Sequence, residues 1–219
     1  MKPPADPPSD QSADLPADWS QAPRHAQEHG GPGDTGTDHP PHRPAPQRGD
    51  LRRVLPTDDH QPLLDLIRRE FAFMEGRIDP PSSMHRLTCA AIAEQAAVGE
   101  IWAVSEADTP VACVFFTAKT PALYVGKLSV AASHRGRGLA RGLIDLAVKR
   151  AGVLGLGHLE LEARIELVEN QAAFASMGFV KTGETAHPGY ERPTSVTMQR
   201  ALAPQPHLPG QSPLKPARN

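Results

Sequence analysis

Residues 127–140 carry the strongest indication of chemistry in this sequence. They read Lys-Leu-Ser-Val-Ala-Ala-Ser-His-Arg-Gly-Arg-Gly-Leu-Ala: a strand pattern ends, two glycines follow, and a helix pattern begins. The first N–H groups of a helix have no intrahelical partner, and the helix dipole is positive at that end. Gly136 and Gly138 let the backbone approach a ligand closely, while Arg135 and Arg137 add two positive charges. These features predict a site for a phosphate or a diphosphate.

Two other phosphate loops and one ordinary turn compete with this interpretation. The nucleotide P-loop requires Lys-Ser or Lys-Thr after its glycines, and neither pair follows Gly138. The dinucleotide fingerprint requires a third glycine where this sequence has Arg141. A plain strand-to-helix turn on a basic surface patch remains the alternative, because a Gly-x-Gly pair alone is a weak signal.

The same segment resembles a known family. Residues 135–140 match the [RQ]-x-x-G-x-[GA] motif of the GNAT N-acetyltransferases, and residues 170–179 resemble the family's helix that closes on a Gly-Phe pair. The resemblance spans about residues 51–202 and implies that the protein binds acetyl-CoA, with the diphosphate on the loop and the pantetheine arm along the preceding strand. The cofactor contacts that it implies are Leu128, Ser129, Val130, Arg135, Gly136, Arg137, Gly138, Leu139, Ala140 and Phe174.

The hydrophobic pattern predicts the elements that must position these residues. Apolar and polar residues alternate as in an α/β (α+β) fold, with a mixed, mostly antiparallel sheet flanked by helices. We expect strands near residues 51–55, 101–105, 111–117, 123–130, 158–163, 178–182 and 194–199. We expect helices near 88–97, from about 139, and near 168–177, and an earlier helix capped by Thr57 or Asp58 with a stripe of Leu63, Leu66, Ile67 and Met74.

Acyl transfer to an amine requires a base, since only the neutral amine attacks and a lysine amine with a pKa of about 10.4 is mostly charged at neutral pH. Strand alternation places Glu160 and Glu162 on one face, and we expect Glu162 to be the base. In the ribosomal-protein N-terminal acetyltransferases a Glu-x-Arg on this strand supplies the base, and Glu162-Ala163-Arg164 loosely resembles it. Exposure to solvent or pairing with arginines is the alternative, and for Glu160 it is the favoured one.

The acid that protonates the leaving thiolate is not where the resemblance places it. The family's tyrosine falls on Phe174 and its asparagine on Leu167. Phe174 cannot donate a proton, although it can pack against the pantetheine or acyl group, or simply belong to the core. The proton must then come from water or from another phenol. Tyr190 is one candidate, but its loop can instead line the acceptor pocket or form a tight turn. The resemblance also implies an oxyanion donor, a backbone N–H near Val130 turned inward by a bulge.

Composition limits the expected compartment and partners. The net charge of -2 gives no basic excess for nucleic acid or for an anionic membrane. No apolar run in residues 1–30 suggests a secretory signal, and no apolar stretch is long enough to span a membrane. Cys89 and Cys113 lack the CxxC spacing, which favours reduced thiols and a cytoplasmic protein. We expect a monomer or homodimer.

Proline usage divides the chain into a core and two extensions. Residues 1–49 hold 11 of the 24 prolines, and residues 203–219 hold 5 more. Such segments cannot bury enough apolar area to offset the entropy of ordering them, so we expect both to be disordered around one acyl-CoA N-acyltransferase domain at 50–202. The histidines of the arm have no metal-ligand spacing, so no metal is expected.

The leading hypothesis is an N-acyltransferase, in the simplest case an N-acetyltransferase, that moves an acetyl group from acetyl-CoA to a primary amine of a small molecule or peptide. Direct attack in a ternary complex is favoured, because no cysteine near the motif could form an acyl-enzyme. A CoA-binding sensor or regulatory module without catalysis is the alternative, motivated by the absent tyrosine. A nucleotide-phosphate binder is a third possibility.

Overall fold

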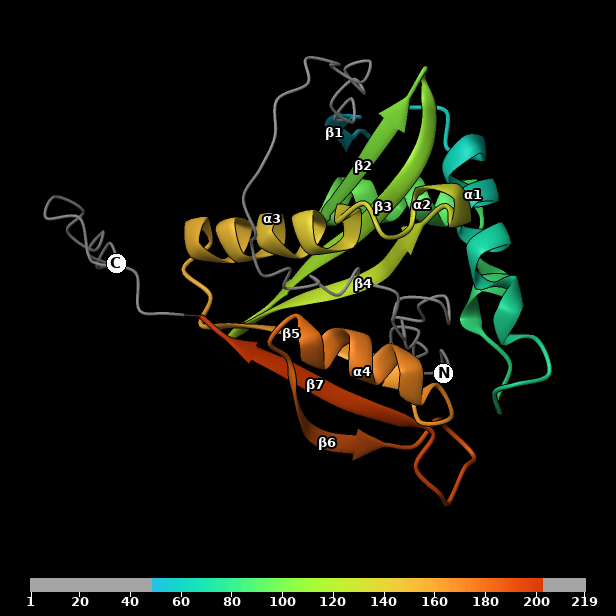
Figure 1. Cartoon of the computed structure of the whole chain (residues 1–219), viewed down its shortest axis with the longest axis vertical. Coiled ribbons are helices and arrows are strands. Elements are labelled where there is room, and N and C mark those ends of the chain that lie inside the picture. Colours follow the sequence, from blue (N-terminus) through green and yellow to red (C-terminus); the bar gives the residue numbers. More distant parts are fainter. Residues whose placement is uncertain (1–48, 203–219) are drawn as a thin grey trace, which may run out of the picture.

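The computed structural model describes residues 49–202 of the chain. The two expected extensions lie outside the described residues, apart from Gly49. A seven-stranded sheet carries the fold, with strand order β1-β2-β3-β4-β5-β7-β6 (Figure 1). The strands are β1 Asp50–Val54, β2 Glu100–Glu106, β3 Thr109–Lys119, β4 Ala122–Val130, β5 His158–Arg164, β6 Val180–Thr185 and β7 Ser195–Ala201. The helices are α1 Gln61–Phe71, α2 Cys89–Val98, α3 Leu139–Val153 and α4 Val168–Ser176, with short 3₁₀ turns η1 Ala72–Met74, η2 Ser83–Arg86 and η3 Ala132–His134.

The sheet confirms the predicted mixed, mostly antiparallel architecture. Every pair of neighbouring strands is antiparallel except β4 and β5, which are parallel and joined through α3. The side chains of β4 are buried along its whole length, as expected for a strand covered on both faces. Helices α1 and α3 both contact β3 and β4, so the core lies between these helices and the centre of the sheet.

The two halves of the sheet separate at the parallel pair. Pairing joins residues 122–124 of β4 only to residues 158–160 of β5. Beyond this short join the two strands diverge, and Figure 1 shows them spreading apart toward α1. Among the described residues, 125–130 of β4 and 161–164 of β5 therefore have no pairing with one another. The divergence of β5 leaves an open backbone edge on β4, at the strand end that precedes the glycine-rich loop.

A bulge interrupts β4 three residues before the predicted place. Cys113 pairs with Ser129 and Phe115 pairs with Gly126, so two residues of β4, Lys127 and Leu128, oppose a single residue of β3. Lys127 has a φ of +47°, in the left-handed region that is costly for residues other than glycine. The bulge expected near Val130 is thus centred on 127–128, and the extra residue is accommodated where β4 leaves β5.

The start of the first helix differs from the prediction. Helix α1 begins at Gln61 after His60, not at a cap formed by Thr57 or Asp58. Asp58 instead accepts hydrogen bonds from the backbone N–H of Leu55 (3.0 Å) and from Arg52 (2.5 Å). Its carboxylate is therefore used to close the turn after β1, and the helix starts three residues later.

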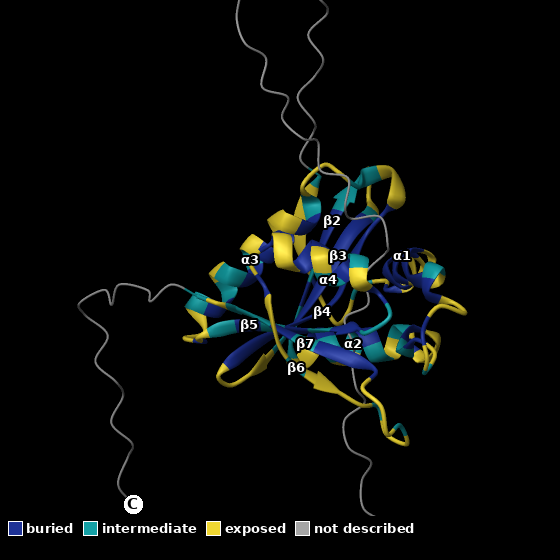
Figure 2. Cartoon of the chain, turned by 60° about the horizontal axis from the view of Figure 1, so that its bottom comes forward, coloured by how far each residue is buried: buried dark blue, intermediate teal, exposed yellow. Residues whose placement is uncertain are grey.

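The end of the chain completes the sheet in an order that the sequence did not reveal. Strand β7 lies between β5 and β6, and β6 forms an edge. β6 begins at Val180, two residues after the predicted start, because Gly178 has a φ of +89° and ends the turn after α4. Figure 2 shows β6 as a largely exposed strand beside the buried centre. Within residues 49–202, no helix is long and apolar enough to cross a membrane.

Candidate functional site

The glycine-rich loop is built from consecutive turns that end in the first turn of α3. After η3 the chain is extended at Arg135, and Gly136 and Gly138 then take φ values of +72° and +81°. Gly138 is the residue that caps α3, in a left-handed conformation. The N–H groups of the first helical turn point out of this end without intrahelical partners. The predicted strand–loop–helix arrangement is therefore present.

The space above Gly138 allows a ligand to approach. A Cβ atom added at this residue would meet no other atom within 4 Å, so the absence of a side chain here is not required by packing. A diphosphate binds to an open main-chain surface at the positive end of a helix dipole, where neighbouring glycines let the ligand approach the backbone closely. The residues present therefore fit the diphosphate of a coenzyme.

Two carboxylates outside the loop hold its cationic side chains. Arg135 donates from Nη2 to Oε2 of Glu70 on α1 at 2.8 Å, and Glu70 is only 4% exposed. On the other side, Glu106 of β2 contacts Nε2 of His134 at 2.9 Å and Nη1 of Arg137 at 3.7 Å. The hydrogen bond from His134 holds the pKa of the Glu106 carboxyl below its usual value. The loop is thus anchored to two separate elements.

Sequence reasoning missed both anchors, although a signal existed for one. Glu70 falls at helical spacing within the apolar stripe of α1 that includes Leu63, Leu66, Ile67 and Met74. A charged residue on the buried face of a helix requires a partner. The pattern therefore indicated a buried ion pair but not which residue would complete it.

The strand residues that precede the loop are fully buried. Leu128, Ser129 and Val130 are at most 1% exposed, and the Ser129 hydroxyl donates to the carbonyl oxygen of Lys127 at 3.3 Å. Their side chains therefore pack in the core. What this segment can offer a ligand is its main chain, on the side where β5 has diverged from β4.

Glu162 lies on β5 beyond the short join with β4. It has intermediate burial, and its neighbours Leu161 and Ala163 are buried, which confirms the predicted alternation. Oε1 of Glu162 accepts a hydrogen bond from Thr185 at 3.4 Å. Glu160 accepts one from Gln199 at 2.8 Å. Both carboxylates therefore lie on the same face of β5, and Glu162 is the one on the diverging part of the strand.

Phe174 is completely buried within the core. Its ring packs edge to face against Phe179, with 5.6 Å between the ring centroids. This contact links α4 to the chain just before β6 and accounts for an apolar residue at this position.

Tyr190 lies in the loop between β6 and β7. Its phenol donates to Oδ1 of Asp79 at 2.6 Å, and Arg192 donates to Oδ2 of the same carboxylate at 2.8 Å. The hydrogen bond to Asp79 raises the pKa of Tyr190, and it lowers the pKa of Asp79. Glu166, after β5, accepts from the N–H of Asp79 at 3.2 Å. Three segments distant in sequence meet here.

A sequence model of the acetyltransferase (GNAT) family matches residues 61–179, more than half of the chain. The chain belongs to the GNAT acetyltransferase family. The family match includes the loop, the strand end before it and the helix that closes on Gly178 and Phe179. No curated protein sequence matches the chain.

Solved GNAT structures share this fold at low sequence identity. A GNAT-family acetyltransferase from Staphylococcus aureus Mu50 superposes with a TM-score of 0.55 at 10% identity, over 70% of this chain and all (100%) of that one. A spermidine N-acetyltransferase chimera of Vibrio cholerae and hSSAT superposes with a TM-score of 0.52 at 19% identity, over 70% of this chain and 95% of that one. A Bacillus subtilis acetyltransferase in complex with CoA superposes with a TM-score of 0.50 at 16% identity, over 70% of this chain and 100% of that one. The GNAT domain of this chain is thus a complete one in fold.

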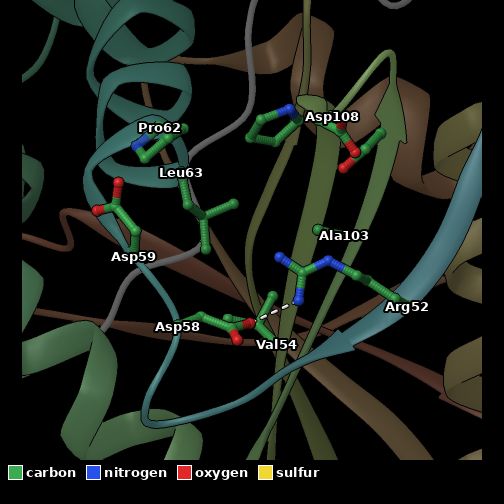
Figure 3. A pocket seen from close by; sticks show the side chains of 10 residues that line it. Arg52, Val54, Asp58, Asp59, Pro62, Leu63, Ala103 and Asp108 are labelled. Atoms are coloured by element: carbon green, nitrogen blue, oxygen red, sulfur yellow. Dashed lines mark hydrogen bonds and ion pairs between the residues drawn. The ribbon is translucent and has the colours of Figure 1, made fainter.

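A separate cavity of about 220 Å³ lies between β1, the start of α1 and the β2–β3 hairpin (Figure 3). Arg52 points across it to Asp58, while Asp59 and Asp108 lie at its margins. None of the residues predicted for the site lines it. In residues 49–202 there is no group of three or more His, Cys, Asp or Glu side chains placed to hold a metal ion.

Proposed function

We propose that residues 50–202 form an N-acetyltransferase that transfers the acetyl group of acetyl-CoA to a primary amine by direct attack in a ternary complex. Family membership supports acetyltransferase activity and the use of acetyl-CoA. The single observation that carries the proposal is the loop before α3, where Gly136 and Gly138 are left-handed and the space above Gly138 is open.

Main-chain groups supply most of the proposed cofactor binding. The amides of residues 136–140 bind the diphosphate, with Arg137 as the cation within reach because its side chain is 50% exposed. The pantetheine arm lies along residues 128–130, where β5 has moved away. Leu139 and Ala140 contribute as the first residues of α3. Phe174 is fully buried against Phe179, so we propose that it contributes through the packing of α4 and not by direct contact with the cofactor.

Glu162 is proposed as the general base. It lies on the diverging part of β5, so an acceptor amine that enters between the strands meets its carboxylate. The carboxylate takes the proton of the ammonium, directly or through one water, and the neutral amine then attacks the thioester carbonyl. The N–H groups at the β4 bulge are the proposed donors to the developing oxyanion.

Tyr190 is proposed as the acid that returns a proton to the leaving thiolate. Its hydrogen bond to Asp79 keeps the phenol protonated, because the pKa of Tyr190 is raised. The phenol must break its hydrogen bond with Asp79 before its proton can move to the thiolate, which makes Tyr190 a weak acid. The thiolate of CoA is only moderately basic, so it can leave before it is protonated, and a weak acid is enough to complete turnover.

The acceptor is proposed to be the amine of a small molecule or of a peptide.

We further propose that the protein is cytoplasmic, which is supported by two free cysteines, of which Cys113 is buried. Burial raises the pKa of its thiol to about 12, so it remains protonated and cannot serve as a nucleophile.

The proposal is tested by measuring release of free CoA from acetyl-CoA and longer acyl-CoAs against peptides, free lysine, polyamines, aminoglycosides and small amines. Amine-dependent release of CoA is the expected result. Tight binding of CoA without turnover on any acceptor would favour the sensor or regulatory module instead. A thermal shift with ATP but not with acetyl-CoA would favour a nucleotide binder.

A further inference from the structure

Glu70 is a buried carboxylate that the proposed chemistry does not use. It lies on α1 and is 4% exposed. Its two oxygens have separate partners: Oε1 accepts from Nε of Arg69 at 3.0 Å, and Oε2 accepts from Nη2 of Arg135 at 2.8 Å. Arg69 is largely exposed, whereas the Arg135 side chain is only 20% exposed. The pair of Glu70 with Arg135 is therefore the shielded one.

This pair determines where the loop begins. Arg135 immediately precedes Gly136, and its Nε also lies 3.5 Å from the carbonyl oxygen of Val130. The guanidinium is rigid and planar, so two contacts fix its position and direction. Because Arg69 is largely exposed, Arg135 is the shielded counter-charge of this buried carboxylate, and its loss would be destabilising, so Glu70 keeps the guanidinium on α1. The charge of Arg135 is thus directed toward the protein.

The second anchor has the opposite character. Glu106 is 40% exposed, and its contact with Arg137 is an ion pair at 3.7 Å. Pairs of this kind between exposed side chains contribute little to stability. An incoming diphosphate can therefore take Arg137 from Glu106 at low cost, whereas it cannot take Arg135 from Glu70.

We propose that Glu70 is a positioning residue for cofactor binding: through Arg135 it fixes the main-chain amides of residues 136–140, while the contact of Glu106 with Arg137 is exchangeable. The inference rests on the proposed function, since it assumes that this loop binds the diphosphate of CoA. It predicts that removing the Glu70 carboxylate weakens CoA binding, whereas removing the Glu106 carboxylate leaves CoA binding unchanged or makes it tighter.

The experiment compares Glu70→Gln with Glu106→Gln by calorimetric titration of CoA and by kinetics with acetyl-CoA. Glu70→Gln is expected to weaken CoA binding by about tenfold or more, and to raise KM for acetyl-CoA more than it lowers kcat. Glu106→Gln is expected to bind CoA as tightly as the wild type or up to about fivefold more tightly, because a competing anion is removed. Unchanged or tighter binding by Glu70→Gln would overturn the proposal and make Arg135 a direct ligand.

A second pair of variants covers the case in which Glu70→Gln does not fold. Arg135→Gln is expected to lose the same fraction of CoA affinity at about 0.05 M and about 0.5 M salt, because the lost charge does not face the ligand. Arg137→Gln is expected to lose affinity mainly at low salt, where screening is weak. A loss confined to low salt in Arg135→Gln would also overturn the proposal.

The wild-type protein separates this failure from failure of the proposed function. If the wild type does not bind CoA, the assignment of the loop to the diphosphate fails. If the wild type binds CoA and both carboxylate variants bind it equally, only the role of Glu70 fails.

Discussion

Among single residues, Glu162 has the most specific proposed role, and it is paired with a natural control on the same strand. Replacing Glu162 by glutamine preserves shape and the hydrogen bond from Thr185 but removes the base. We expect kcat to fall by about 10²–10⁴-fold and its rise with increasing pH to flatten, while CoA affinity is retained. The measurement is the pH profile of kcat with saturating acetyl-CoA and amine.

Glu160→Gln supplies the control for this prediction. Glu160 lies on the same face of β5, with its own hydrogen bond from Gln199, but on the part of the strand that is still paired with β4. Its replacement should change kcat by less than about threefold. Equal effects of the two variants would remove Glu162 from the role of base.

Tyr190→Phe tests the acid. The change removes the phenol that donates to Asp79 and leaves the contact of Arg192 with that carboxylate. Because the hydrogen bond to Asp79 raises the pKa of Tyr190, the wild-type phenol keeps its proton over the whole neutral range and loses it only at alkaline pH. We expect a fall in kcat of about tenfold or more at neutral pH, with KM for acetyl-CoA unchanged. An unchanged kcat would leave Tyr190 with a purely structural role.

The residues that sequence could predict are those whose role depends on local chain geometry. Gly136, Gly138 and the alternation around Glu162 follow from short-range rules, and the structure has each of them as expected. The partner of Arg135 could not be predicted, because Glu70 is 65 positions away and only the packing of α1 against β4 brings them together.

At the scale of elements, the junction of β4, the glycine-rich loop and α3 makes substitution of Gly138 a more specific test of the diphosphate site than substitution of its neighbours. A side chain at a φ of +81° costs the protein about 1–2 kcal/mol, and in addition it would fill the space above the loop. Gly138→Leu should therefore reduce CoA affinity by about 100-fold or more, beyond a modest loss of thermal stability. Calorimetry with CoA and thermal unfolding measure the two effects.

Gly155 is the matched control for this substitution. It lies after the other end of α3, has a φ of +68°, and also has no atom within 4 Å of an added Cβ. Gly155→Leu should lower stability by a similar amount and leave CoA affinity within about twofold. Similar losses of stability and CoA affinity in Gly138→Leu would contradict the placement of the diphosphate.

Element boundaries were predictable where one local signal dominated. Helix α2 begins at Cys89, one residue after the predicted start, because the Thr88 hydroxyl accepts from Ala91 at 3.1 Å and caps the helix, and α3 begins at Leu139 as expected. The cap of α1 was mispredicted because three polar residues, Asp58, Asp59 and His60, compete for the same turn. The position of the bulge at Lys127 could not be predicted, since the alternation of buried and exposed residues vanishes in a strand covered on both faces.

For the whole molecule, the short join between β4 and β5 predicts that a coenzyme bound as proposed stabilises the fold by cross-linking the two halves of the sheet. Only residues 122–124 and 158–160 pair across the two halves of the sheet. A ligand at 100 times its Kd stabilises the folded state by about 2.7 kcal/mol, which corresponds to an increase in Tm of roughly 5–10 °C for a domain of this size. Thermal unfolding with and without CoA measures it, and dephospho-CoA should produce a similar shift because the diphosphate is retained.

The opening between β4 and β5 also bears on how this domain can diverge in sequence. A surface made of peptide groups keeps its donors and acceptors when the side chains around it are exchanged, provided that the backbone path is preserved. Solved members that share only 10–19% of their residues with this chain still share its path. Under the proposed function, the backbone that holds the common coenzyme can thus stay the same while the side chains that face the amine differ from one acceptor to the next.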